Sequence, residues 1–160
     1  MNEVMPMYTT HIMNTPLGNM EMRLDSSRVI CARFVDKPSR TQAVHSSTSS
    51  RIAQKLNGFL SGETQLLDVV CVEQGTAFQL NVWAALRQIP FGETWTYSDL
   101  ARHINRPKAV RAVANAVAQN PCLVFTPCHR VVRKDGAIGG YAGGVERKRA
   151  LLRLEGVFKD

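Results

Sequence analysis

The 160-residue sequence predicts a mixed α/β protein with a small N-terminal α/β part and a mainly helical C-terminal part. Strand-like segments joined by a turn occupy the start of the chain, and amphipathic helical segments with clear capping signals occupy its second half. Apolar residues make up 44% and charged residues 21%, so the chain can bury a core. No apolar run approaches the roughly 20 residues of a membrane span, and no secretory signal is evident. We therefore expect a cytoplasmic protein without a membrane partner.

The first half of the chain has the pattern of a small sheet followed by a helix. We expect strands over residues 7–13, 20–24 and 28–35, with a turn-forming segment at 15–19. Residues 36–50 are rich in serine and predict a surface loop, or a helix that starts at its end. Residues 51–60 place apolar side chains on one helical face. A further short strand is expected over residues 66–72.

A boundary near residue 75 separates two predicted domains, 1–74 and 75–160. Thr76 and Gln79 fit a capping box, in which each side chain satisfies a backbone N–H of the other residue. Apolar residues at helical spacing follow as far as Ile89, so we expect a helix that begins at the boundary.

Two short helical segments follow, residues 98–104 and the alanine-rich 108–119, with an Asn-Arg-Pro break between them. This outline is typical of a helix-turn-helix, although helical hairpins that bind nothing share it. The many alanines suit either tight packing against a neighbouring helix or entry into a groove. The glycine-rich segment 136–144 is either a mobile loop or a pocket wall, and residues 145–154 predict a basic amphipathic helix.

The positive charge is confined to the second half of the chain. Residues 1–75 hold seven Lys/Arg and seven Asp/Glu, whereas residues 76–160 hold 13 Lys/Arg and six Asp/Glu, which accounts for the net charge of +7. Such a segment is typical of a surface that binds a polyanion, nucleic acid first of all, or of a solubilising positive face.

The four cysteines differ in their neighbours. Cys31, Cys71 and Cys122 lie in apolar runs and are expected to be small buried hydrophobes. Cys128 instead lies beside His129 and an arginine, and such cationic neighbours favour the nucleophilic thiolate. The spacing of the cysteines matches no zinc motif, so neither a metal nor another cofactor is expected.

The segment Pro127-Cys128-His129-Arg130-Val131 resembles the signature of the O6-alkylguanine-DNA alkyltransferases, also called methylated-DNA–protein-cysteine methyltransferases. Neighbouring segments resemble the family in the same order. They include Gly75-Thr76-Ala77-Phe78-Gln79, Gly92-Glu93-Thr94, Arg111-Ala112-Val113, Asn120-Pro121, Gly140-Tyr141-Ala142-Gly143-Gly144 and Glu155-Gly156. The resemblance is dense over residues 75–156 and looser before them. It implies a ribonuclease-H-like N-terminal domain and a C-terminal domain with a helix-turn-helix.

The resemblance also implies a single-use reaction in which an alkyl group moves from guanine O6, or from O4 of thymine, to Cys128. His129 would act through a water as the base that generates the thiolate, and Glu155 would orient it. Asn120 would brace the turn that leads into the cysteine strand. Tyr97 would donate a hydrogen bond to N3 of the guanine as charge develops there.

The implied partner is double-stranded DNA, bound by a monomer through its minor groove. The damaged nucleotide is flipped out of the stack, and Arg111 would fill the space that it leaves. Further contacts to DNA or to the flipped base are implied for Ala112, Arg130, Val131, Tyr141 and Ala142.

Several residues depart from the usual pattern of the family, among them Asn115, Val117 and Gln119. Ala114 stands where many members have glycine, and Thr126 replaces an aliphatic residue, so its hydroxyl needs a partner if it is buried. Three alternatives remain at this level: a lesion sensor without transfer, a cysteine hydrolase that uses Cys128 and His129, and a transcription factor without chemistry. The sensors of this family lack the cysteine, so Cys128 argues against the first alternative.

Overall fold

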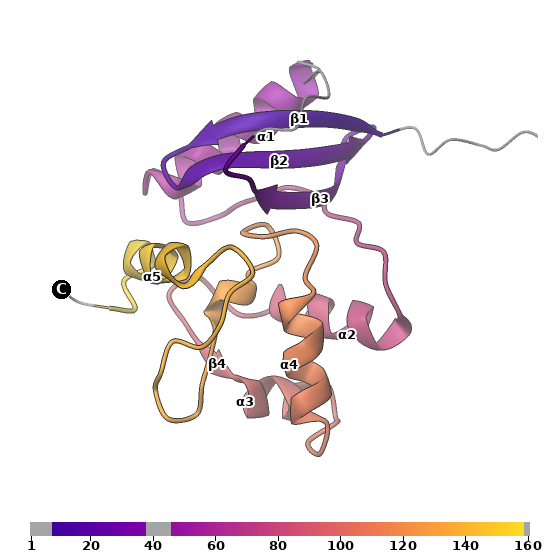
Figure 1. The fold of residues 1–160 in the computed structure, drawn as a ribbon, viewed down its shortest axis with the longest axis vertical. Helices are drawn as coiled ribbons and strands as arrows, with labels where there is room; N and C mark the ends of the chain where they lie inside the picture. Colours follow the sequence, from indigo (N-terminus) through magenta and orange to yellow (C-terminus); the bar gives the residue numbers. More distant parts are fainter. Residues whose placement is uncertain (1–7, 38–45, 159–160) are drawn as a thin grey trace, which may run out of the picture.

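The computed structural model describes residues 8–37 and 46–158, which form two stacked parts (Figure 1). The N-terminal part is an antiparallel sheet in the order β1-β2-β3 with one helix. Its elements are β1 (Thr9–Thr15), β2 (Gly18–Asp25), β3 (Arg28–Phe34) and α1 (Ser47–Leu60). The three strands lie where the sequence predicts them, and the mixed α/β class is confirmed.

A tight turn sets the register of the β1–β2 hairpin. Thr15 pairs with Gly18, and the Thr15 hydroxyl donates a hydrogen bond of 2.6 Å to the Gly18 carbonyl. Gly18 has a φ of +119°, which favours a residue without a Cβ atom. Alternate side chains such as Met20, Met22 and Leu24 are then buried on the inner face.

One alternative is confirmed and one prediction needs correction in the N-terminal part. Helix α1 begins at Ser47, so a helix does start at the end of the serine-rich segment, where Ser46 and Ser49 form a capping box. Residues 38–45 of that segment lie outside the described residues. Residues 66–72 form no strand, and only Cys71 makes an isolated bridge, to Val29. The free edge of β3 is shared, because residues near Cys122 pair with Ala32 on that same edge. Neither segment therefore has room to extend its pairing.

The C-terminal part is mainly helical. Its elements are α2 (Ala77–Leu86), β4 (Trp95–Thr96), α3 (Tyr97–His103), α4 (Val110–Ala118), the 3-10 turn η1 (Cys128–Arg130), β5 (Val131–Val132) and α5 (Val145–Leu154). The capping box of Thr76 and Gln79 is confirmed, and α5 has the predicted bounds. The short parallel pair β4–β5 was not predicted, because two-residue strands carry no periodicity.

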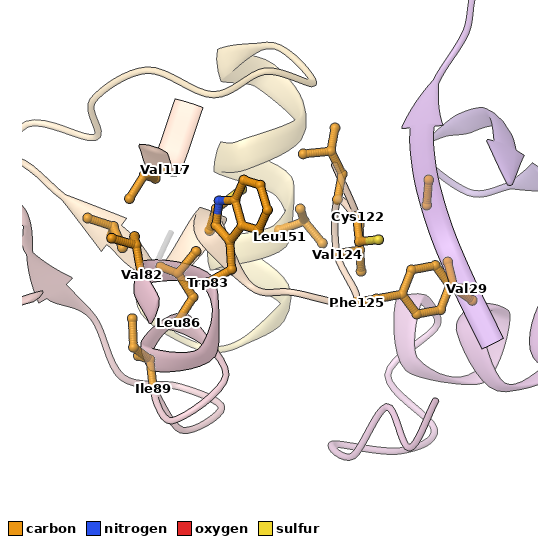
Figure 2. Close-up of a cluster of buried hydrophobic side chains, with 14 of the residues drawn as sticks. Val29, Val82, Trp83, Leu86, Ile89, Val117, Cys122, Val124, Phe125 and Leu151 are labelled. Carbon is orange, nitrogen blue, oxygen red and sulfur yellow. The ribbon is translucent and has the colours of Figure 1, made fainter. Parts of the chain in front are cut away.

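A continuous set of buried side chains joins the two parts (Figure 2). Trp83 of α2 lies near its centre, and its indole N–H donates a hydrogen bond of 2.8 Å to the carbonyl of Ala116 in α4. Cys122 is buried there as predicted, whereas Cys31 and Cys71 are only half-buried. Within residues 8–37 and 46–158, no helix has the length and apolarity to cross a membrane.

Candidate active site

A pocket of about 260 Å³ lies where α3, α4, η1 and the glycine-rich segment meet. Its lining residues are Tyr97, Val117, Ala118, Cys128, Gly140, Tyr141 and Ala142. This volume is just below the roughly 300–1,000 Å³ of sites for drug-sized ligands, so the pocket suits a group the size of one base. A larger cavity of about 530 Å³ between the two parts is lined by apolar side chains and by Gln65, Arg87 and Arg130, with no nucleophile.

Asn120 organises the irregular segment that carries Cys128 to the pocket. Its side-chain amide donates a hydrogen bond of 2.8 Å to the Thr126 carbonyl and accepts one of 3.0 Å from the backbone N–H of Cys122. Val124 within this segment has a φ of +72°, which is costly for a β-branched residue. The Cys128 backbone N–H donates to the same Thr126 carbonyl at 2.8 Å. Cys128 therefore begins a 3-10 turn rather than lying in a strand.

His129 and Glu155 form a fully buried pair behind the cysteine. The two atoms His129 Nε2 and Glu155 Oε2 are 2.6 Å apart, and both side chains are 0% exposed. Burial alone raises the pKa of Glu155, but His129, Arg130 and the backbone N–H of Gly92 outweigh it and hold that pKa at about 2. The carboxylate is thus charged at neutral pH and fixes the imidazole.

The protonation state of His129 follows from these contacts. Burial lowers the pKa of His129 below its ordinary 6.5, so the ring is neutral at neutral pH. Its Nε2–H then donates to the Glu155 carboxylate, which leaves Nδ1 as an unprotonated nitrogen. Among the described residues Nδ1 has no hydrogen-bond partner, although it is buried. The neutral ring can therefore accept a proton at Nδ1.

Cys128 is 4% exposed, and burial raises the pKa of its thiol to about 11, even though Asn120 and Lys148 act to lower it. The resting thiol is accordingly protonated at neutral pH. Any nucleophilic reaction needs a base to remove this proton, because the thiolate is the reactive form.

Lys148 is a site residue that matches the family pattern but to which the sequence analysis assigns no role. It is 0% exposed, and its Nζ donates hydrogen bonds of 2.6 Å to the Val131 carbonyl and 3.0 Å to the Gly140 carbonyl. Burial lowers its pKa to about 8, and the nearby Cys128 acts against that shift. Its spacing of three and four residues from the buried Leu151 and Leu152 is the signal that places this lysine on the inner face of α5.

Comparisons with known proteins identify the family. Residues 77–157 match the family model described as the DNA-binding domain of 6-O-methylguanine DNA methyltransferase. The chain belongs to the methylated-DNA–protein-cysteine methyltransferase family. A methyltransferase of that name from Mycobacterium tuberculosis is 39% identical over 146 residues, which are 89% of this chain and 88% of the relative. One from Methanosarcina acetivorans is 45% identical over 104 residues, 65% of this chain and 67% of the relative. These matches confirm the resemblance seen in the sequence.

Solved structures of the family agree with the fold. The crystal structure of the Mycobacterium tuberculosis O6-methylguanine methyltransferase has a TM-score of 0.84 and 38% identity, and 93% of each chain is covered. A structure of the Mycobacterium tuberculosis protein in complex with DNA has a TM-score of 0.81 and 38% identity, and covers 93% of this chain and 92% of that one.

The remaining residues that the family resemblance singles out lie in three places. Tyr97, Tyr141 and Ala142 line the pocket with Cys128, while Val131 is buried behind it. Arg111 and Ala112 are exposed at the start of α4. Arg111 and the pocket-lining Ala118 are seven positions apart, which corresponds to about 10 Å along the helix.

Arg130, for which the resemblance implies a contact to DNA, makes its hydrogen bonds within the protein. Its guanidinium donates to Glu155 Oε1 at 2.8 Å and to the Ile89 carbonyl at 2.7 Å, and its side chain is 11% exposed. It does not line the pocket with Cys128. Through its bond to Glu155, Arg130 helps to fix the carboxylate that is paired with His129. In the part of the chain that the structure describes, no three His, Cys, Asp or Glu side chains are placed to hold a metal ion.

Proposed function

We propose that Cys128 is the acceptor cysteine of this DNA repair methyltransferase and that the flipped O6-alkylguanine occupies the 260 Å³ pocket. The family to which the chain belongs transfers alkyl groups from DNA to a protein cysteine. One observation carries the assignment to Cys128. Its thiol is the sulfur among the pocket-lining residues, and His129, the next residue in the chain, is paired with the buried Glu155.

The neutral imidazole supports the role of His129 as the base. Nδ1 takes the thiol proton through a bridging water, and Glu155 stabilises the imidazolium that forms. The thiolate attacks the alkyl carbon, a sulfur–carbon bond forms, and the bond from that carbon to guanine O6 breaks with its electrons on the base. The thioether is not cleaved again, so each molecule acts once.

Two tyrosines of the pocket keep their hydroxyl protons at neutral pH. Burial raises the pKa of Tyr97, and it raises the pKa of Tyr141 well above 10, with the nearby Cys128 acting in the same direction for both. Both hydroxyls therefore stay protonated and can donate hydrogen bonds. In this proposal Tyr97 donates to N3 of the guanine, and Tyr141 forms the pocket wall.

Lys148 adds a positive charge near the reacting sulfur. Because it also binds the carbonyls of Val131 and Gly140, it holds the two sides of the pocket at a fixed separation. In this proposal, backbone groups of Cys128, Val131 and Ala142 read the edge of the base.

The helical pair α3 and α4 is proposed to act as a helix-turn-helix on the minor groove of duplex DNA. Arg111 is exposed at the start of α4 and fills the space left by the flipped nucleotide, and the small Ala112 beside it allows close approach. We assign residues 75–160 to this DNA-binding and acceptor domain, which carries the whole net charge of +7, and residues 1–74 to a ribonuclease-H-like domain. The protein is proposed to act as a monomer.

The proposal is tested with duplex DNA that carries O6-methylguanine with a labelled methyl group. We expect one label per protein chain, on Cys128, and none on Cys128→Ala. Cys31→Ser is the matched control, because Cys31 lies half-buried on β3 outside the pocket, and it should take up label like the wild type. Label that persists in Cys128→Ala, or that leaves the protein as a small product, would refute the assignment; the second result would indicate a hydrolase.

A further inference from the structure

We infer that Arg147 is a positioning residue that ties the N-terminal hairpin to the pocket wall and so limits the size of the alkyl group that the pocket accepts. The inference rests on the proposed function of Cys128 and its pocket. Arg147 lies in α5, which Figure 1 shows beside the N-terminal sheet and the loops of the C-terminal part.

The guanidinium of Arg147 binds two backbone carbonyls that are far apart in the sequence. Its Nε donates a hydrogen bond of 2.8 Å to the Leu17 carbonyl in the turn between β1 and β2. Its Nη1 donates one of 3.0 Å to the Gly143 carbonyl in the glycine-rich segment. The planar fork of arginine presents separate nitrogens to two such acceptors in a fixed geometry, whereas a lysine would have to reach both from one nitrogen.

Apolar packing reinforces this junction. The Arg147 guanidinium carbon lies 4.5 Å from the ring centroid of Phe34, at the end of β3. A Cβ atom added at Gly143 would lie 3.0 Å from the Phe34 ring and 2.7 Å from the Tyr141 ring. The N-terminal sheet therefore contacts the loop that carries Tyr141. Asp36 adds little, because it is 97% exposed and 4.0 Å from the guanidinium.

These contacts bear directly on the pocket. Tyr141 and Ala142 line it, and they are flanked by the two glycines whose carbonyls are bound by α5 side chains. Lys148 holds the Gly140 carbonyl, and Arg147 holds the Gly143 carbonyl. The wall is thus fixed at both ends, and its Gly143 end is also tied to the N-terminal hairpin. Release of that end would let Tyr141 and Ala142 move outward and would enlarge the pocket.

The test compares single-turnover transfer from O6-methylguanine and from O6-benzylguanine in the same duplex. For Arg147→Ala we expect methyl transfer to slow by roughly tenfold, since two hydrogen bonds of a charged group are lost. Benzyl transfer should slow less, so the benzyl-to-methyl rate ratio rises. Arg147→Lys keeps the charge and should shift the ratio in the same direction by less. Arg149→Ala, on the same helix, should keep the wild-type ratio.

The outcomes separate this inference from the proposed function. If the wild type transfers neither group to Cys128, the proposed function fails, and this inference fails with it. If the wild type transfers both groups, an unchanged ratio in Arg147→Ala and Arg147→Lys would overturn the role of Arg147 alone. An unchanged ratio overturns the role of Arg147 even where both rates fall equally, because a general structural defect slows the transfer of both groups alike. Arg147→Lys retains the charge and one donor nitrogen, so it keeps the test open if the alanine variant does not fold.

Discussion

The chemical centre and the exposed start of α4 are built in opposite ways. Cys128, His129 and Glu155 are almost fully buried, and hydrogen bonds from several elements hold the surrounding segments. Arg111 and Ala112 are exposed, and the helix that they begin has no side-chain cap. In the proposed function, this difference means that the reacting groups are arranged before DNA binds, whereas the DNA-facing groups remain exposed for the partner to order.

The largest effect is expected from the buried pair. Glu155→Gln removes the charge that orients and stabilises His129, and His129→Ala removes the base itself. We expect the rate of methyl transfer to fall by about 10²–10⁴-fold in His129→Ala, because that is the usual contribution of a positioned base. The affinity for duplex DNA, measured by fluorescence anisotropy, should stay within a few-fold of the wild type. A comparable loss of affinity would show that the two regions are not independent.

Arg111→Ala acts on the other region. Flipping costs a few kcal/mol, and the side chain that fills the vacated stack offsets part of this cost. Without that side chain the flipped state is less stable. Transfer from duplex DNA should slow by roughly 10- to 100-fold. A fluorescent base analogue placed opposite the lesion should report a smaller population of flipped nucleotides. Lys108→Ala, three residues before Arg111, is a neighbouring control and should reduce affinity without changing the flipped fraction of bound DNA. Normal transfer by Arg111→Ala would contradict its assigned role.

Acid should destabilise the fold through the chemical centre. His129 stays neutral in the fold while an ordinary histidine has a pKa of 6.5, and the pKa of Glu155 is held at about 2 against an ordinary 4.5. The unfolded chain therefore binds more protons, and the free energy of unfolding falls as the pH drops below about 6.5 and falls more steeply below 4.5. Urea denaturation between pH 7 and 3 measures this slope. Glu155→Gln should flatten the lower part, and an unchanged slope there would contradict the carboxylate's role.

The smallest effect is expected at Thr126, whose carbonyl accepts the hydrogen bond from the backbone N–H of Cys128. Its buried hydroxyl donates a hydrogen bond to the buried Glu73 carboxylate, which also accepts one of 2.6 Å from Arg87. Thr126→Val deprives a buried carboxylate of one partner and should lower the free energy of unfolding by about 1–3 kcal/mol. The exposed Thr64→Val is the control, with a change within about 0.5 kcal/mol. Equal values for the two variants in urea denaturation would contradict this role of the Thr126 hydroxyl.

Local signals were enough to predict most of the elements. The capping box of Thr76 and Gln79 and the apolar face of residues 145–154 lie within single helices, so the sequence contains the whole pattern. The strand expected over residues 66–72 does not form. An apolar run can predict a strand, but it does not indicate whether a sheet edge is free to pair with it. In the structure that edge is shared with residues near Cys122, far along the chain.

The same distinction holds for the candidate site. The contiguous motif around Cys128 and the family resemblance led to the residues that the structure brings together. A partner for the Thr126 hydroxyl was expected on burial, but its identity as Glu73 depends on a contact across 53 positions of the chain. The contact between Arg147 and the Leu17 carbonyl spans 130 positions, and no periodicity or spacing reports it.

The most direct test of the two-region account is the rate of alkyl transfer from free O6-benzylguanine, a base without DNA. His129→Ala, Arg111→Ala and the wild type are compared in parallel by mass spectrometry of the alkylated protein. If the chemical centre is complete before DNA binds, Arg111→Ala should react with the free base at the wild-type rate, and His129→Ala should be slower by about 10²-fold or more. A free-base rate that falls in Arg111→Ala as far as in His129→Ala would contradict the account.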